Sequence, residues 1–142
     1  MAQIKHIAIA TQDADKTAKF YKEVFGLKEI AKLDSPNASG YYLSDGNINL
    51  AILDFKNDQV SGPEYGQTYS GIHHIGFEVE SLEEIAKKLE EAHSQPREDI
   101  NQALHIGMGG PRTANVETKY AGPDGVIIDV SEPGWGGTRG LD

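Results

Sequence analysis

Two short histidine-bearing segments of the same design occur in this chain, and each leads directly into an amphipathic helical pattern. Residues 5–10 read Lys-His-Ile-Ala-Ile-Ala, and residues 73–79 read His-His-Ile-Gly-Phe-Glu-Val. Their alternation of side-chain types is typical of a strand, and Asp13 or Ser81 then provides a helix N-cap. Both halves also end alike, with an Asp-Gly turn ahead of a strand. The repeat predicts two tandem copies of one small unit.

The first unit is expected to run from about residue 3 to residue 55. A strand is predicted over 3–11, and the following helix ends where Gly26 can adopt a left-handed conformation. Turn residues then separate three further strands, predicted over 28–33, 40–43 and 48–53. Residues 56–71 are polar and lack periodicity, which predicts a linker.

The second unit is expected over about 72–132. Its predicted elements are a strand over 72–80, a helix over 82–92, a weak strand over 96–100, a Gly-rich stretch over 101–113, and strands over 114–120 and 126–131. A Gly-rich tail, 133–142, is expected to be partly ordered at best. The sequence therefore predicts an α+β fold in which two tandem βαβββ modules form a single domain.

Composition limits the partners of such a domain. The 142 residues are 38% hydrophobic, enough for one compact core. A formal charge of -9 disfavours nucleic acid and anionic membrane surfaces. The chain has no cysteine, which excludes thiolate ligands and disulfides, and no segment approaches the roughly 20 apolar residues of a membrane span. A cytoplasmic soluble protein is expected.

Strand alternation separates the side chains that face the core from those that face away from it. Ile7 and Ile9 are expected to face a helix, so His6 points to the opposite face, beside alanines. By the same alternation His74 points away from the core beside Gly76. His73 falls on the apolar side, which makes it the weaker ligand candidate.

The last strands of the two units add polar groups to this open face. Asp129 lies between the apolar Ile128 and Val130, and Asn49 alternates with apolar neighbours. If the sheet curves, His6, His74 and Asp129 can converge with Asn49 beside them. Two imidazoles and one carboxylate are a sufficient facial set for a divalent metal. A lone strand histidine is more often structural, but three such residues on one face favour a metal site.

Several segments together resemble the vicinal oxygen chelate superfamily, which includes glyoxalase I, methylmalonyl-CoA epimerase, extradiol dioxygenases, fosfomycin-resistance transferases and bleomycin-resistance proteins. The similar segments are residues 6–10, 20–21, 25–27, 74–77 and 122–129. The resemblance extends from Ile4 to about Glu132. It implies paired βαβββ modules that form a curved mixed sheet around a U-shaped cleft, and a homodimer.

The resemblance also implies roles for particular residues. His6 and His74 fall on the two histidine ligand positions, and Asp129 falls where the family usually has a glutamate. Asn49 falls on the remaining position, which is glutamate in bacterial glyoxalase I and glutamine in the epimerase. A neutral, short residue there disfavours glyoxalase isomerisation. One divalent transition metal ion is therefore expected, with Fe²⁺ or Mn²⁺ favoured and Ni²⁺, Co²⁺ or Zn²⁺ possible.

Three classes of function stay open on this basis. Chemistry of the extradiol dioxygenase type is narrowly favoured by the open triad, although the loop residue His105 is only a weak candidate for its acid/base group. A glyoxalase- or epimerase-type isomerase or lyase is the close alternative, with Glu78 as catalytic base. A metal-free binding protein of the bleomycin-resistance kind is disfavoured by the retained ligands. Tyr42 and Asn49 are expected to bind a small-molecule substrate, although a packed structural role for Tyr42 fits the sequence equally well. Arg112 could anchor an anion, but a solvent-exposed loop without such a role is the simpler interpretation of its segment.

Overall fold

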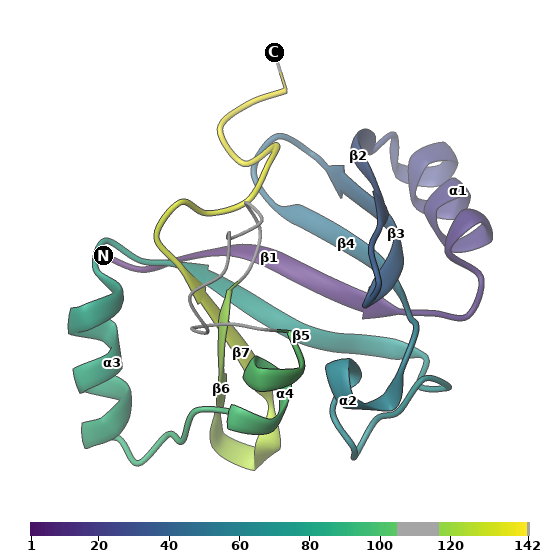
Figure 1. Ribbon diagram of the computed structural model, residues 1–142. Helices are drawn as coiled ribbons and strands as arrows, with labels where there is room; N and C mark the ends of the chain where they lie inside the picture. The colour runs from purple at the N-terminus through teal and green to yellow at the C-terminus, as the bar shows by residue number, and fades with distance from the viewer. Residues whose placement is uncertain (105–116, 142) are drawn as a thin grey trace.

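A seven-stranded mixed sheet dominates the computed structural model, which describes residues 1–104 and 117–141 (Figure 1). The strands are β1 (Gln3–Ala10), β2 (Lys28–Asp34), β3 (Ala38–Ser44), β4 (Asn49–Phe55), β5 (Gly71–Glu78), β6 (Thr118–Ala121) and β7 (Ile127–Ser131). Their order across the sheet is β2-β3-β4-β1-β5-β7-β6. The antiparallel pair β1–β5 joins the two halves, while β1–β4 and β5–β7 are parallel. The predicted α+β class is confirmed.

The helices are α1 (Ala14–Phe25), α2 (Asp58–Ser61), α3 (Leu82–Glu91) and α4 (Glu98–Ala103), with a 3-10 turn over Pro123–Gly125. The predicted ends of α1 are confirmed. Asp13 Oδ1 accepts a hydrogen bond from the backbone N–H of Lys16, and Gly26 adopts a left-handed conformation with φ of 72°. Ser81 caps α3 in the same way.

The second half differs from the expected pattern between α3 and β6. The strand predicted over 96–100 is reduced to a bridge between Pro96 and Tyr120, followed by α4. Within α4, the Asn101 side chain accepts from Lys119 N at 2.9 Å and donates to Lys119 O at 3.1 Å. The Asn101 amide therefore joins the backbone of Gln95 and Arg97 in satisfying the edge of β6, and no regular further strand forms there. His105 and Arg112 lie outside the described residues.

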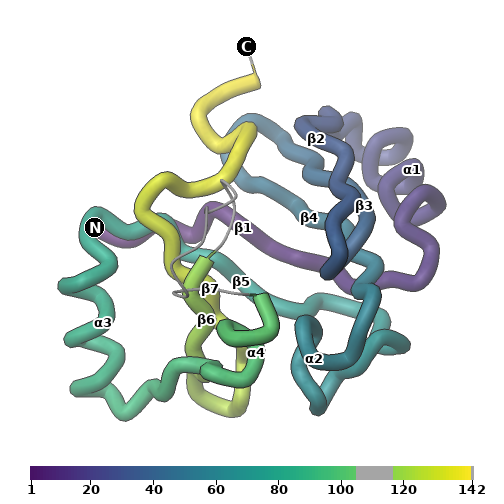
Figure 2. The backbone as a smooth tube through the Cα atoms, viewed as in Figure 1, coloured from purple at the N-terminus to yellow at the C-terminus, as the bar shows by residue number. Residues whose placement is uncertain are grey.

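Two hydrophobic clusters fix α1 and α3 on the same face of the sheet. Ala18 of α1 packs with Leu43 and Ile52, and α3 packs through Leu82, Ile85 and Leu89 against a cluster around Val130. The side chains predicted to face away from the core thus point to the opposite, concave face. The short helices α2 and α4 lie side by side near one end of that face (Figures 1 and 2).

Two segments expected to be irregular have defined positions. The predicted linker contains α2, which is capped by Asn57 and buries Val60. The tail packs along the concave face, where Trp135 is 3% exposed and Ser44 Oγ donates to Gly137 O at 2.7 Å. The expectation of partial order was wrong for the described part of the tail. In the described residues, no helix combines the length and the hydropathy that crossing a membrane would require.

Candidate metal and substrate site

The structure brings together the three predicted ligands, which come from three neighbouring strands. His6 Nε2 of β1 lies 3.0 Å from His74 Nε2 of β5, which lies 3.2 Å from Asp129 Oδ2 of β7. One ligand atom from each residue lies within 4.8 Å of the other two. All three side chains are buried. The sheet register explains this convergence, because Gly76 pairs with both His6 and Asp129, and its missing side chain leaves room for the His6 side chain and the Trp135 ring.

Hydrogen bonds fix the tautomer of His6. Asn49 Nδ2 donates to Gly136 O at 3.0 Å, so Asn49 Oδ1 faces His6 as an acceptor. His6 Nδ1 lies 2.8 Å from that oxygen and must therefore carry the ring proton. The lone pair of the neutral ring is then on Nε2. Burial, followed by the proximity of His74, lowers the pKa of His6 to about 3 and keeps the ring neutral.

A second chain of hydrogen bonds orients His74. Ser61 O can only accept, so His73 Nε2 carries a proton toward it at 2.6 Å. His73 is neutral, because burial first and the neighbouring His74 second lower its pKa to about 3. Its Nδ1 is then an acceptor for the Nδ1–H of His74, at 2.7 Å. His74 consequently directs Nε2 at His6 and Asp129.

The site therefore brings several hydrogen-bond acceptors together with no donor from the described residues between them. The Nε2 atoms of His6 and His74 point their lone pairs at each other, and Asp129 Oδ2 is buried with no hydrogen-bond partner in the described structure. A shared proton on His74, or a metal cation, would remove the repulsion between these atoms. Two imidazole nitrogens and a carboxylate oxygen are ligands suited to a divalent transition metal. The donor set therefore fits a metal ion.

Two charged residues at the start of β6 complete the polar part of the site. Lys119 Nζ donates to Asp129 Oδ1 at 2.8 Å, and both side chains are buried. Burial alone would raise the pKa of Asp129, but the protonated form of His74 and the Lys119 ammonium would both favour the carboxylate and hold that pKa well below its usual value. Glu117 is also buried. Its burial, followed by the negative charge of Asp129, raises its pKa to about 8, which the Lys119 ammonium opposes.

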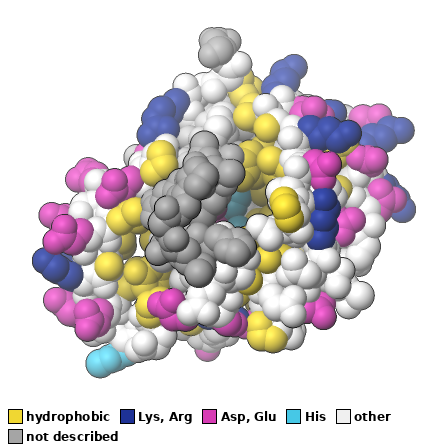
Figure 3. All heavy atoms as spheres, in the orientation of Figure 1, with side chains coloured by type: hydrophobic (Ala, Val, Ile, Leu, Met, Phe, Trp, Pro, Cys, Tyr) yellow, Lys and Arg dark blue, Asp and Glu magenta, His cyan; other side chains and the backbone are white. Residues whose placement is uncertain are grey.

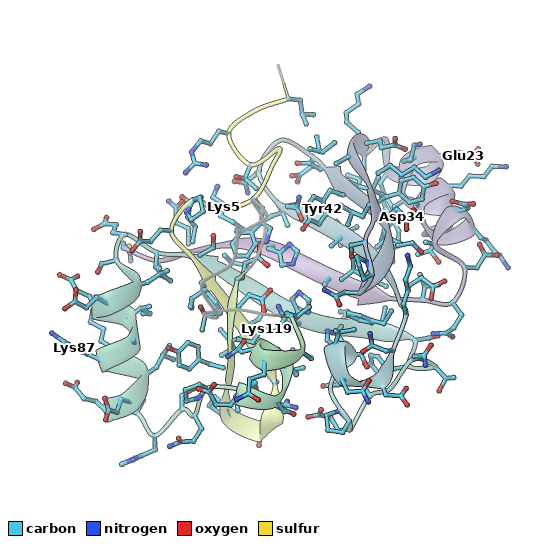
Figure 4. All side chains as sticks on the ribbon, in the orientation of Figure 1. Lys5, Glu23, Asp34, Tyr42, Lys87 and Lys119 are labelled. Atoms are coloured by element: carbon cyan, nitrogen blue, oxygen red, sulfur yellow. The ribbon has the colours of Figure 1, made fainter. Side chains whose placement is uncertain are left out.

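A cavity of about 360 Å³ adjoins the two histidines. Its inner end is polar and is lined by His6, Tyr42, His74, Glu117 and Lys119. An apolar wall continues outward along Leu33, Ala38, Leu53, Phe55, Val60 and Leu104. Lys32, Asp34, Ser35 and Asn37 surround the remainder. Figure 3 shows hydrophobic side chains around a hollow with histidine atoms at its bottom. Tyr42 and Lys119, labelled in Figure 4, reach it from strands in opposite halves of the sheet, β3 and β6.

The C-terminal tail closes the other side of the histidine pair. The Trp135 indole stacks on the His6 ring with 4.6 Å between centroids and an interplanar angle of 3°. Gly76 makes this contact possible, since a Cβ there would lie 2.6 Å from Trp135 and 2.8 Å from His6 Cβ. The single tryptophan of the chain is thus in contact with a candidate metal ligand.

The other predicted site residues have different surroundings. Tyr42 lines the cavity, as a substrate-binding residue should. Asn49 is fully buried between His6 and Gly136, so its amide orients a ligand and is not available to substrate. Glu78 accepts from Arg139 at 2.8 Å and is not among the described residues that line the cavity. The geometry therefore does not favour the expected substrate contact of Asn49 or the expected catalytic role of Glu78.

Sequence reasoning missed three residues of this site. His73 was placed on the wrong face, because β5 has one extra residue where the register moves from Ala8–His74 to Ile9–Ile72. Such a bulge interrupts the alternation on which the prediction depended. Glu117 and Lys119 are two residues apart in the predicted strand 114–120 and therefore face the same side of the sheet, and Lys119 pairs with Asp129. That spacing was the signal that could have identified both residues.

The fold and the site together define an α+β protein with two related halves and a candidate metal centre between them. The family model of the Glyoxalase/Bleomycin resistance protein/Dioxygenase superfamily matches residues 3–130. The chain belongs to this superfamily, which confirms the resemblance found in the sequence.

Curated relatives include two kinds of enzyme. Human mitochondrial methylmalonyl-CoA epimerase is 24% identical over 136 residues, which cover 93% of this chain and 74% of that protein. Glyoxylase I 4 of Arabidopsis thaliana is 26% identical over 130 residues, with 92% and 70% covered. These similarities support an enzyme of the isomerase type.

Solved structures support the fold. A variant of Streptomyces coelicolor methylmalonyl-CoA epimerase in complex with 2-nitronate-propionyl-CoA has a TM-score of 0.67 at 19% identity, covering 90% of this chain and 94% of that one. A hypothetical protein from Bacillus halodurans has the same TM-score at 20% identity, with 91% and 92% covered. At these identities the likeness concerns the fold alone.

Proposed function

We propose that this protein is a metal-dependent isomerase that moves a proton on a small carbonyl compound with two adjacent oxygen atoms. The observation that carries the proposal is the convergence of His6 Nε2, His74 Nε2 and Asp129 Oδ2, all acceptors, beside a cavity that the two histidines line. The similarity to an epimerase and to a glyoxylase favours an isomerase over the oxygenase that the open triad alone suggested.

His6, His74 and Asp129 would hold the metal. Imidazole and carboxylate together suit Fe²⁺ and Mn²⁺, and also Ni²⁺, Co²⁺ and Zn²⁺. When bound, a divalent cation would polarise carbonyl oxygens as a Lewis acid and stabilise negative charge that develops on them. Removal of a proton from the carbon beside such a carbonyl then becomes easier.

The cavity indicates what the remainder of the substrate is like. Its apolar wall, with Phe55 and Leu53, suits a short aliphatic or aromatic substituent next to the reacting carbonyl. Tyr42 can place its hydroxyl against a substrate oxygen. The Lys119 ammonium holds Asp129 and also faces the cavity, where it would attract an anionic oxygen. The acyl part of methylmalonyl-CoA, the substrate of the epimerase relatives, has suitable chemistry.

Metal binding is the first test of the proposal. Trp135 lies against His6, so quenching of its fluorescence by Co²⁺, together with calorimetry using Mn²⁺ and Zn²⁺, measures occupancy directly. We expect one metal per chain, and at least a 100-fold loss of affinity in Asp129→Asn and His6→Gln. His93→Asn replaces an exposed histidine with positive φ and serves as the matched control. Equal affinities in all four proteins would refute the triad.

Reaction type is tested separately with the metal-loaded protein. Proton nuclear magnetic resonance in deuterium oxide follows loss of the α-hydrogen signal of methylmalonyl-CoA and of the methylglyoxal–glutathione adduct. An oxygen electrode with catechol-type compounds tests the dioxygenase alternative. Exchange without oxygen consumption supports an isomerase, and oxygen uptake would favour the alternative. Tight ligand binding by metal-free protein without turnover would favour a binding protein.

Two expectations from the sequence stay predictions. Sedimentation equilibrium of the purified chain tests the homodimer. Fractionation of cells that produce the protein tests a cytoplasmic location.

A further inference from the structure

The proposed isomerase needs a group that exchanges a proton with a substrate carbon, and the ligands themselves cannot supply it. His6 and His74 have their Nδ1 protons committed to Asn49 and His73, and their Nε2 atoms face the metal position. Asp129 is bound through one oxygen to Lys119 and has the other directed at His74. The proton-transfer group must therefore come from the cavity wall.

Most other titratable groups that line the described cavity are unsuited to this role. Asp34 is exposed at the mouth, and Lys56 Nζ lies 2.7 Å from its carboxylate. Burial holds the pKa of Tyr42 far above its ordinary value, so the phenol keeps its proton. The Lys119 ammonium is held by Asp129. Glu78, on the same face of the sheet, is paired with Arg139.

Glu117 differs from these groups because it lines the cavity and has no charged partner among the described residues. The Oε1 of Glu78 is also buried without a hydrogen-bond partner there, but Glu78 does not line the cavity and its Oε2 accepts from Arg139. Glu117 is 7% exposed, lines the polar end of the cavity together with both histidines, and has a buried Oε1 with no hydrogen-bond partner among the described residues. Burying a carboxyl oxygen without a partner costs stability, and such a group in a native fold calls for an explanation such as a catalytic role. Its location at the head of β6, two residues before Lys119, sets it on the face of the sheet that carries the triad.

We propose that Glu117 is the catalytic acid/base of this site, taking a proton from a substrate carbon beside the triad and returning it to an adjacent carbon, or to the opposite face of the same carbon once the enolate has turned. This inference rests on the proposed function. In the first step the carbon–hydrogen bond breaks, the proton moves to a Glu117 carboxylate oxygen, and the electron pair stays on the substrate as an enolate. In the second step the proton returns to carbon. No oxidant or other reactant is required.

The electrostatics of the site suit both steps. Burial and the Asp129 charge raise the pKa of Glu117 to about 8, so ionised and protonated forms are both accessible near neutral pH. A carboxylate of raised pKa is a stronger base toward carbon than an exposed one. The nearby Lys119 ammonium favours the enolate oxygen that forms as the proton leaves.

Glu117→Gln tests the inference, because it keeps the shape of the side chain and removes the exchangeable acid. With methylmalonyl-CoA in deuterium oxide we expect α-hydrogen exchange to fall about 10²- to 10⁴-fold. Metal affinity, from Trp135 quenching by Co²⁺, should change less than about threefold, since Glu117 is not a proposed ligand. Glu117→Asp should recover part of the exchange. Glu78→Gln tests the rival glutamate, and Glu23→Gln on the exposed part of α1 is the surface control.

The possible results separate the two proposals. If the parent exchanges the α-hydrogen and Glu117→Gln does so equally fast, Glu117 is not the base and the isomerase proposal stands. If the parent binds metal but exchanges neither substrate, the proposed function fails. Difference infrared spectra of parent and Glu117→Gln give an independent readout. A protonated carboxyl band present at pH 6 and lost above pH 9 is expected, and its absence at pH 6 would overturn the assignment.

Discussion

The rings of His73 and His74, adjacent residues of β5, lie nearly perpendicular, with their Nδ1 atoms 2.7 Å apart. Adjacent residues of a regular strand point to opposite faces, so this contact exists only because of the bulge at His73. Ser61 O holds the far side of the His73 ring at 2.6 Å. A backbone carbonyl of α2 thus determines, through two imidazoles, which nitrogen His74 offers to a metal.

Replacement of His73 should weaken metal binding without removing a ligand. His73→Phe retains a ring among Phe55, Tyr65 and Tyr69 but offers no acceptor to His74 Nδ1. Because partners behind a ligating histidine contribute about 10- to 100-fold to metal affinity, we expect a loss of that size. Calorimetry with Zn²⁺ measures it, and nitrogen-15 resonances of His74 report the tautomer. Parent-like affinity with an unchanged His74 tautomer would contradict the hydrogen-bond chain.

The ion pair of Lys119 and Asp129 predicts that removing the carboxylate alone destabilises the protein more than removing both charges. Asp129→Asn leaves the buried ammonium without a counter-charge, which should lower the free energy of unfolding by about 3–5 kcal/mol. Adding Lys119→Met removes that charge and should restore most of the loss. Urea denaturation of the metal-free proteins measures both effects. Metal affinity should stay low in the double variant, since the carboxylate ligand is still missing. A double variant no more stable than Asp129→Asn would show that the ammonium is not the cause.

Alternation of side chains was sufficient to predict the convergence of His6, His74 and Asp129. These residues lie in strands whose buried faces are strongly apolar, so register is well determined there. The same reasoning failed for His73, since a bulge adds a residue without changing the local composition. The strand predicted over 96–100 failed for a different reason. After the single bridge at Pro96, the Asn101 side chain bonds to both backbone groups of Lys119, and the chain continues as α4 instead of as a strand.

Long-range contacts explain why the sequence did not predict the ordered packing of the C-terminal tail. Its glycines and short polar residues carry no periodic signal, and local sequence alone predicts disorder. In the structure, however, Gly136 O and Gly137 O accept side-chain hydrogen bonds from Asn49 and Ser44. These partners lie more than 80 residues away in sequence. No pattern within the tail could have revealed them, although a lone tryptophan in such a segment was a hint of anchoring.

The packing of Trp135 predicts how much the C-terminal tail contributes to the stability of the fold. Trp135 is 3% exposed and stacks on His6, so Trp135→Ala should cost about 3–5 kcal/mol of unfolding free energy. Metal affinity should also fall, because the His6 ring loses one of the surfaces that hold it. Circular dichroism in urea replaces fluorescence as the probe in this variant. Leu141→Ala, at a 44% exposed position further along the tail, is the control and should stay within about 0.5 kcal/mol of the parent.

Glu117 predicts how the stability of the metal-free protein depends on pH. Its pKa is raised from 4.5 to about 8 in the folded state, first by burial and then by the Asp129 charge. Between these values the folded protein keeps a proton that the unfolded chain releases. The contribution of Glu117 to stability therefore declines as pH rises from 4.5 to 8, and it is constant outside this window.

Glu117→Gln removes this dependence, because an amide does not titrate. Relative to the parent, the variant should gain stability as pH rises through that window, by up to a few kcal/mol at pH 9. Urea denaturation at pH 5, 7 and 9 with a chelator present measures the difference. Glu23→Gln, at an exposed position of α1, should follow the parent at every pH. The lowered pKa of Asp129 changes stability in the opposite direction, but only below about pH 4. It therefore does not mask the contribution of Glu117 between pH 5 and 9. A constant difference in stability between parent and Glu117→Gln from pH 5 to 9 would show that Glu117 is already ionised in the folded protein. The carboxyl group would then lack the proton affinity that its proposed role requires.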